Sequence, residues 1–254
     1  MDKQQIIKFQ SVLDVVNLNG IIMHDVKYLQ KVLKSPELQD IEWWNCHDDP
    51  YYFMTHWAKT LDVHDREQSI KMFPEKEHLK ILVEVWLKEY LLLIPKSRQM
   101  MMSWLFTTLY LWDTQFHAGR LTFFQSKKEE DADDLVKRAK FVWDNEPKFL
   151  KRYYLGGKFH NLKINPQHNG QHTYCKMNFP EINSEIRGIP QGGDVIRMHT
   201  ASGILSDEMA FQPEAKAAYT AAKPTLSANG RFTGVSTAED NTFFEDMCFD
   251  SVEM

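Results

Sequence analysis

The sequence predicts an α/β fold in which a mostly parallel sheet is covered by helices on both faces and preceded by a small N-terminal helical subdomain. Two observations support this prediction: strand-like and helix-like segments alternate after about residue 70, and residues 1–70 are mostly helix-like. The length of 254 residues and the 43% hydrophobic content suit one large domain with a subdomain. We therefore expect a helical lid subdomain over 1–70 and a core domain over 71–254.

Charge and composition exclude several classes of protein. The net charge of −5 argues against a surface wholly devoted to nucleic acid, and no apolar run reaches the length of a membrane span. The cysteines Cys46, Cys175 and Cys248 are widely scattered and form neither a disulfide framework nor a zinc motif. We expect a reducing compartment and no membrane partner.

The first 70 residues are expected to be helical. HDVKYLQKVLKS (24–35) has helical periodicity and is predicted to stop at Pro36, and the aromatic-rich DPYYFMTHWAKTLD (49–62) is predicted to form a second helix. A third helix should begin after Pro74 and lead into the apolar strand LLLIP (91–95).

The middle of the chain alternates between helix and strand. After LLLIP we expect a helix over 103–117, ended by Gly119 in a left-handed cap, and then the strand LTFFQS (121–126). A capping box formed by Ser126 and Glu129 predicts the start of a long helix that ends before Pro147.

The last hundred residues are less regular. Residues 155–200 are rich in Gly, Asn, Pro and His and are expected to form hairpins and loops. Further on, ASGILSDE (201–208) predicts a strand, QPEAKAAYTAAKP (212–224) a helix and RFTGVST (231–237) another strand.

The stretch PKSRQMMMS (95–103) lies between a predicted strand and a predicted helix, which is where nucleotide-binding proteins keep a phosphate loop. The pattern GxxxxGK[ST] is broken here, because Lys96, Met101 and Met102 replace the two glycines and the lysine and only Ser103 is in place. The stretch is either a phosphate loop with a displaced lysine or an ordinary strand–helix corner with a methionine core.

Two other strand ends carry polar residues. ILSDEMAF (204–211) ends an apolar strand in Asp207 and Glu208, at the sheet edge where open α/β folds bind ligands. In a nucleotide hydrolase the Asp holds Mg²⁺ and the Glu orients the attacking water. GVSTAED (234–240) ends a strand in Ser236 and Thr237, which could sense a γ-phosphate or simply form a turn.

The order of these motifs resembles that of additional-strand (ASCE) P-loop NTPases, and their residues resemble the motor domain of tailed-phage large terminases. The likeness covers roughly residues 49–247 and is carried by KSRQMMMSW, IRGIPQGGDVIRMHTASGILSDEMAFQ and GRFTGVSTAEDNTFF. It implies that Ser103 and Asp207 ligate Mg²⁺, that Glu208 is the catalytic carboxylate, and that Ser236 and Thr237 couple hydrolysis to movement.

Large terminases often carry the loop lysine early in the loop, so the resemblance assigns Lys96 to the phosphates and Arg98 to catalysis. Because both loop glycines are missing, we expect a less strained turn that binds phosphate with the N-terminus of the following helix. At least one of the three methionines should pack in the core. The implied nucleotide-binding residues are Lys96, Ser97, Arg98, Gln99, Met100, Met101, Met102 and Ser103, with Phe73 and Pro74 near the adenine.

The resemblance also implies a function and partners. We expect an ATPase that uses ATP and Mg²⁺ to move double-stranded DNA into a procapsid in the host cytoplasm, as a ring, together with a portal protein and a small terminase subunit. The nuclease domain of large terminases has no counterpart in this sequence, so no nuclease activity is expected from this chain. The alternatives are a helicase-like ATPase that tracks DNA and a non-hydrolysing assembly or scaffold protein.

Two sets of basic residues remain open. An arginine that acts across a subunit interface could be Arg66, Arg187 or Arg197. Residues 137–152 combine lysines and arginines with aromatic residues, which fits either a solvated helix face or a surface that contacts DNA.

Overall fold

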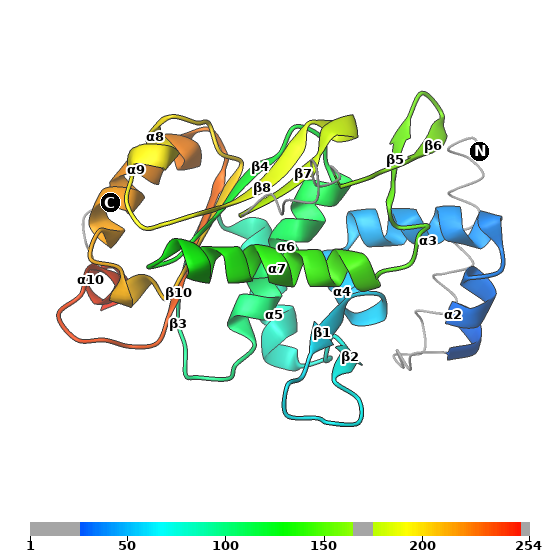
Figure 1. The fold of residues 1–254 in the computed structure, drawn as a ribbon, viewed down its shortest axis with the longest axis horizontal. Coiled ribbons are helices and arrows are strands. Elements are labelled where there is room, and N and C mark those ends of the chain that lie inside the picture. The colour runs from blue at the N-terminus through cyan, green and yellow to red at the C-terminus, as the bar shows by residue number, and fades with distance from the viewer. Residues whose placement is uncertain (1–25, 165–174, 250–254) are drawn as a thin grey trace.

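The computed structural model describes residues 26–164 and 175–249 (Figure 1). The elements follow one another as α2 (Val26–Val32), α3 (Pro36–Asp48), α4 (Pro50–His56), β1 (Lys59–Leu61), β2 (Ile70–Met72), α5 (Glu77–Lys88), β3 (Leu91–Pro95), α6 (Met102–Phe116), β4 (Leu121–Gln125), α7 (Glu129–Asn145), β5 (Arg152–Leu155), β6 (Lys158–Asn161), β7 (Lys176–Phe179), η2 (Pro180–Ile182), β8 (Ser184–Ile189), α8 (Asp194–Arg197), β9 (Gly203–Asp207), η3 (Met209–Phe211), α9 (Ala215–Ser227), β10 (Arg231–Ser236) and α10 (Phe243–Phe249).

A six-stranded sheet with the order β3-β10-β9-β4-β8-β7 forms the centre of the molecule. All neighbouring strands are parallel except β7, which runs antiparallel to β8 at the edge. The predicted mostly parallel sheet is confirmed. Strand β10 is inserted between β3 and β9, so the strand that precedes the phosphate-loop candidate is separated from the Asp-Glu strand by one additional strand.

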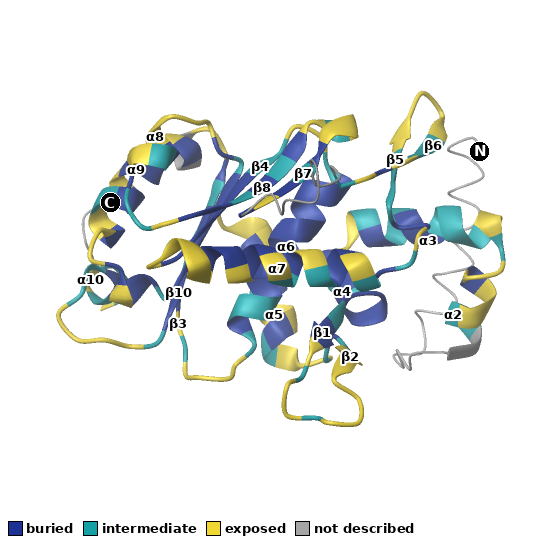
Figure 2. Ribbon diagram, in the orientation of Figure 1, coloured by how far each residue is buried: buried dark blue, intermediate teal, exposed yellow. Residues whose placement is uncertain are grey.

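Both faces of this sheet are covered. Adjacent residues on a strand point to opposite faces, so Phe124 and Leu205 pack in the core with α6 and α7, whereas Phe123 and Ile204 pack with α9. Figure 2 shows the central strands almost entirely buried. Side chains on both faces of the sheet are buried away from water, which explains why the sequences of these strands are continuous apolar runs.

The N-terminal helices pack on the same core as α6. Trp43 and Phe53 belong to the apolar cluster that contains Leu109 and Phe124. The proposed boundary near residue 70 stays a prediction; the antiparallel pair β1–β2 joins Lys59 to Met72 across it. Residues 1–25 lie outside the described residues.

Two helix ends differ from the sequence predictions. Helix α2 ends at Val32, before Pro36 as predicted, but Pro36 also opens α3, with Ser35 as its N-cap, because a proline at the first helical position loses no hydrogen bond. The helix predicted over 49–62 ends at His56, and the chain then enters β1, because pairing with β2 competes with further helix.

The long helix α7 also starts later than its sequence suggests. Ser126 is buried, and its N–H donates to the carbonyl oxygen of Ile189, so this residue extends the β4–β8 ladder instead of capping the helix. Helix α7 begins at Glu129 after Lys128, without a side-chain cap. The predicted capping box is therefore wrong. The left-handed Gly119 after α6 is confirmed, with a φ of 74°.

Residues 155–200 contain more regular structure than predicted. Besides the β5–β6 hairpin, they contribute β8, a full parallel strand of the central sheet, and the edge strand β7. The polar residues Glu185 and Arg187 alternate with buried ones in β8, which masks its strand character. No helix in the described ranges is long and apolar enough to span a membrane.

Candidate active site

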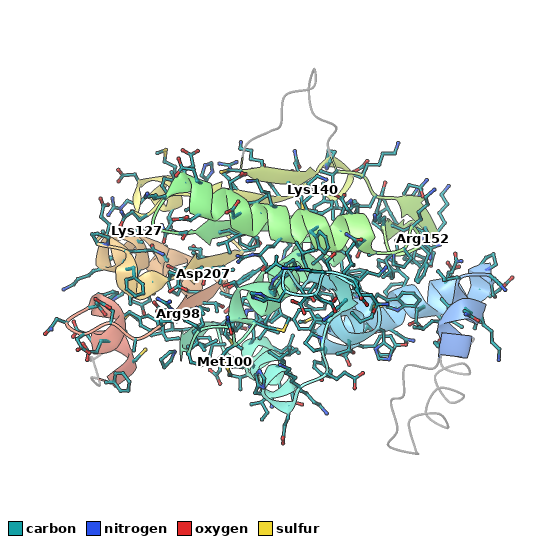
Figure 3. The ribbon with its side chains drawn as sticks, turned by 60° about the horizontal axis from the view of Figure 1, so that its bottom comes forward. Arg98, Met100, Lys127, Lys140, Arg152 and Asp207 are labelled. Carbon is teal, nitrogen blue, oxygen red and sulfur yellow. The ribbon has the colours of Figure 1, made fainter. Side chains whose placement is uncertain are left out.

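The carboxyl ends of three neighbouring strands meet at one edge of the sheet, where parallel strands expose ligand sites. The register pairs Ser236 with Pro95 and Val235 with Asp207, and the N–H of Lys96 donates to the carbonyl oxygen of Ser236 at 2.9 Å. A pocket of about 640 Å³ opens at this edge. Figure 3 shows Arg98, Lys127 and Asp207 in the same part of the molecule. The three motifs that are distant in the sequence thus form one site.

Ser103 and Asp207 lie in direct contact at the floor of the pocket. The Ser103 hydroxyl donates to Asp207 Oδ2 at 2.8 Å, and the buried Asp207 Oδ1 has no hydrogen-bond partner among the described residues. Burial raises the pKa of Asp207, while the Ser103 hydrogen bond and the charge of Lys96 oppose that rise. A carboxylate oxygen without a donor beside a hydroxyl is a donor set that suits Mg²⁺, which binds oxygen ligands and keeps several waters.

Glu208 lies beside this pair and is neutralised by Lys96. The Lys96 ammonium is 2.8 Å from Glu208 Oε1, and the Thr237 hydroxyl donates to Glu208 Oε2 at 3.5 Å. The Lys96 side chain is only 10% exposed, whereas that of Glu208 is 40% exposed. Glu208 has a left-handed backbone with a φ of 51°, which is unusual for a residue with a Cβ. The displaced lysine thus reaches the catalytic-carboxylate candidate across the sheet edge.

The loop itself is more strained than predicted. Gln99 and Met101 have φ angles of 64° and 60°, so two residues with side chains occupy the left-handed region. Met101 stands where the loop pattern has its second glycine, so the glycine conformation is kept without the glycine. This corrects the expectation of a relaxed turn: the strand–helix connection fixes the backbone, and a cost of about 1–2 kcal/mol per residue is tolerated.

The three loop methionines have different environments. Met102 is 3% exposed and belongs to the large core cluster, as expected for at least one of them, whereas Met100 is 38% exposed. Met102 therefore packs under the loop at the start of α6.

Ser236 and Thr237 have different roles in the structure. The Ser236 hydroxyl accepts a hydrogen bond from the N–H of Ala210 at 3.1 Å, which ties β10 to the segment after β9. Thr237 lines the pocket and contacts Glu208. The predicted coupling pair thus connects the pocket to the backbone that carries Glu208.

The structure brings seven of the predicted site residues into the pocket and leaves seven outside it. Phe73 is 1% exposed in the core, where its N–H donates to the carbonyl oxygen of Ala58. The residues that line the pocket are Lys96, Arg98, Gln99, Ser103, Asp207, Glu208 and Thr237. Those outside its lining are Ser97, Met100, Met101, Met102, Ser236, Phe73 and Pro74.

One face of α7 forms a wall of the pocket that the sequence did not reveal. Arg138 lies there, with its guanidinium carbon 6.0 Å from the centre of the Trp104 ring, and its charge lowers the pKa of Asp207 against the effect of burial. The α7 residues that line the pocket have the spacing i, i+3, i+4, i+7, which predicts that they share one face of the helix. The spacing does not predict that this face lies against the pocket. The additional lining residues are Ser126, Lys127, Asp131, Asp134, Leu135, Arg138 and Phe211.

None of the three arginines considered for an intersubunit role lines this pocket. Arg187 donates to Glu185 at 2.7 Å, and Arg197 pairs with Asp194 at 2.9 Å on α8. Arg66 is exposed in the segment between β1 and β2. Their role between subunits stays a prediction.

Solved structures with a similar fold come from phage large terminases. The HK97 bacteriophage large terminase aligns with 79% of this chain and 40% of its own, at 11% identity and a TM-score of 0.56. The large terminase ATPase domain of Thermus phage P74-26 aligns over 61% of each chain at 18% identity and a TM-score of 0.41. A large terminase of a thermophilic bacteriophage in complex with ADP aligns with 64% of this chain and 39% of its own, at 9% identity and a TM-score of 0.46.

No protein-family model and no curated protein matches the chain. The HK97 likeness shows the fold, and the strand order agrees with the predicted additional-strand type of α/β fold, because β10 lies between β3 and β9. The resemblance to large terminases is confirmed at the level of the fold. This chain spans about 40% of the HK97 protein and 61% of the P74-26 domain.

Proposed function

We propose that this chain is a Mg²⁺-dependent ATPase and the motor domain of a viral large terminase that moves double-stranded DNA into a procapsid. One observation carries the proposal: Lys96, Ser103, Asp207, Glu208 and Thr237 converge on one pocket from the ends of three neighbouring parallel strands. This arrangement matches the needs of phosphoryl transfer, which depends on positioning and charge neutralisation.

The residues divide the chemistry among them. Ser103 and Asp207 hold Mg²⁺, which when bound neutralises charge on the phosphates. Glu208 orients the attacking water and accepts its proton. The Glu208 carboxylate becomes available for this role when the Lys96 ammonium leaves it and pairs with the phosphates of ATP instead. Arg98, exposed at the mouth of the pocket, offers a planar fork to the transferred phosphoryl group.

The proposed motor acts as part of a larger assembly. The terminase-like fold supports a ring around double-stranded DNA that works with a portal protein, a procapsid and a small terminase subunit in the host cytoplasm.

Phosphate release from ATP tests the proposal. The purified chain should release phosphate only with Mg²⁺, and Glu208→Gln should keep nucleotide binding while slowing turnover by about 10²–10⁴-fold, the contribution of a general base. Glu84→Gln on the exposed side of α5 is the matched control and should hydrolyse ATP normally. Parent-level turnover in Glu208→Gln would remove that residue from the mechanism.

A non-hydrolysing assembly protein is the second candidate. The observation that favours it is the absence of both loop glycines, which leaves Gln99 and Met101 strained. A parent chain that binds ATP but releases no phosphate, with or without DNA, would support this alternative over the motor.

A further inference from the structure

The basic residues of this acidic chain are unevenly distributed. Residues 147–180 contain six Lys and Arg residues and not one Asp or Glu. Because the whole chain carries −5, the remaining residues carry −11. A local positive segment on an acidic protein indicates an anionic partner for that segment.

The structure divides the basic stretch after residue 136 into two parts. On α7, Lys137 pairs with Asp133 and Asp134, each at 2.9 Å, and Lys140 pairs with Asp144. These lysines are neutralised by their own helix, as expected for a solvated helix face. The α7 part of the stretch therefore offers little to a phosphate backbone.

The lysines that follow α7 are different. Lys148, Lys158 and Lys163 are exposed, and none forms an ion pair with a described residue. Glu181 accepts a hydrogen bond from the main-chain N–H of Lys163 at 3.4 Å, not from its ammonium. The Lys176 ammonium, by contrast, lies 3.9 Å from Glu185 Oε1 and pairs with it. Within the described residues, the β5–β6 segment thus carries three exposed lysines without an ion pair: Lys148 before β5, Lys158 in β6 and Lys163 after β6.

This hairpin is a preformed projection. Strands β5 and β6 pair from Arg152↔Asn161 to Leu155↔Lys158, and the two turn residues Gly156 and Gly157 both have positive φ, as a type I′ turn requires. Figure 1 shows β5 and β6 extending beyond the body of the molecule. A rigid arm loses little conformational entropy when it binds.

Arg152 fastens the base of the hairpin to α3. Its guanidinium pairs with Asp40 at 2.9 Å and lies 4.3 Å from the Phe159 ring centre, and Trp43 Nε1 donates to its carbonyl oxygen at 3.0 Å. Arg152 is thus engaged in holding the arm, and it is the neighbouring lysines that remain available.

The other face of the ribbon points away from these contacts, because side chains alternate along a strand. It carries Tyr153 stacked on His160 at 5.2 Å, followed toward the tip by Leu155 and Lys158. Leu155 is 63% exposed. Tyr153 and His160 are half-buried, and Tyr153 packs against the core cluster, so the exposed residues of this face are Leu155 and Lys158 near the tip. An exposed lysine near the tip of a projecting ribbon suits a phosphate backbone.

We infer that the β5–β6 hairpin, with Lys148, Lys158 and Lys163, is a contact surface for the phosphate backbone of duplex DNA. This inference rests on the proposed DNA motor, whose DNA-facing surface is otherwise unassigned. Figure 3 shows Arg152, at the base of the hairpin, at the opposite end of the molecule from Arg98 and Asp207. The hairpin lysines do not line the pocket, so hydrolysis of ATP does not need them.

The salt dependence of DNA binding tests this surface. Affinity of the full chain for a labelled DNA duplex is measured at several NaCl concentrations for the parent and for Lys148→Gln/Lys158→Gln/Lys163→Gln. Each lost phosphate contact lowers the slope of log K against log salt by about 1, so the triple variant should lose about 3. The corresponding triple Lys→Arg variant should keep the parent slope.

A matched control removes three exposed lysines elsewhere, Lys80, Lys88 and Lys216, none of which pairs with a described residue. Its slope should stay within about 1 of the parent. The assignment is overturned if the slope falls equally in both triple variants, or if it does not fall in the hairpin triple variant. Binding of the parent to anionic vesicles but not to DNA would also overturn it. Phosphate release by the hairpin triple variant should match that of the parent. A parent that releases no phosphate would contradict the proposed motor function, but the salt dependence of DNA binding would still test the hairpin surface.

Discussion

Glu42 and Asp207 are both buried carboxylates, but their surroundings differ. Glu42, on α3, is fully buried and accepts hydrogen bonds at both oxygens. Its donors are Tyr28 Oη at 2.9 Å, Tyr52 Oη at 2.7 Å, Trp57 Nε1 at 2.8 Å and Asn45 Nδ2 at 3.3 Å.

Within the described ranges, Asp207 has a single side-chain donor, the Ser103 hydroxyl, and its second oxygen is buried without a donor. The residue that follows it, Glu208, has a left-handed backbone. A buried acceptor without a donor costs about 1–3 kcal/mol. Glu42 therefore organises the N-terminal helices, whereas Asp207 retains an unused acceptor that a ligand can employ. At the site, a buried acceptor without a donor and a left-handed backbone occur in two adjacent residues, Asp207 and Glu208.

The largest effect on stability should come from Glu42. Glu42→Ala leaves two phenolic hydroxyls and an indole N–H without their acceptor, and we expect a loss of about 3–5 kcal/mol in the free energy of unfolding. Urea denaturation followed by circular dichroism measures it, with the exposed Glu84→Ala as control. A loss below about 1 kcal/mol would contradict the structural role of this cluster.

Glu146 is a third buried carboxylate, intermediate between these two. Its Oε2 accepts from Gln115 Nε2 at 3.2 Å, but its Oε1 and Gln115 Oε1 are buried without partners in the described part of the chain. Burial raises the pKa of Glu146 from 4.5 to about 8. The folded state therefore keeps a proton that the unfolded state releases. The resulting stability is complete below pH 4.5 and is lost as the pH rises toward 8.

Glu146→Gln should remove this pH dependence, because a neutral amide does not ionise. Between pH 5 and pH 8 the free energy of unfolding of the parent should fall by on the order of a few kcal/mol, whereas that of the variant should not. Unfolding free energies at both pH values decide it, with Glu84→Gln expected to follow the parent. Parallel pH profiles of the parent and Glu146→Gln would contradict the raised pKa.

Asp207→Asn should behave in the opposite way to the Glu42 variant. We expect a gain of about 1 kcal/mol in stability, since a neutral amide replaces a buried carboxylate with an unpaired oxygen, together with loss of Mg²⁺-dependent ATP hydrolysis. Because burial raises the Asp207 pKa, the gain should be larger at pH 8 than at pH 4. Thermal unfolding and phosphate release are the two measurements. A loss of stability in Asp207→Asn would show that Asp207, like Glu42, stabilises the fold.

The smallest effect concerns the loop backbone. Met101→Gly relieves a left-handed φ of 60° but frees the unfolded chain, so the net gain should be at most about 1 kcal/mol. Met100→Gly, in the same loop without a left-handed φ, should be destabilising in the same urea titration. Equal losses in both variants would show that Met101 is not strained.

The sequence was a reliable guide where local signals and the final structure agree. Strands β3, β9 and β10 are apolar runs that end in polar residues, and α6 and α9 have helical composition, so their positions follow from the residues. The association of Ser103 with Asp207 and Glu208 was also predictable, because parallel strands end at a common edge. These features depend on a short stretch of chain and on one general rule of sheet geometry.

Other features were decided by contacts between distant segments. The β8 strand has too many polar residues to be recognised, and Ser126 pairs with β8 when its spacing favours a helix cap. The packing of α7 brings Arg138 to the pocket, and Phe73 is buried in the core.

The sequence by itself determined the α/β class, the strands that carry the site and the position of its carboxylates. Only the tertiary structure decided that Lys96 meets Glu208, that Met101 takes a glycine conformation and that three hairpin lysines stay unpaired. The physical reason is that apolar periodicity acts within one segment. Strand order, backbone strain and charge pairing depend on which segments meet, and the free energy of the whole core fixes that choice.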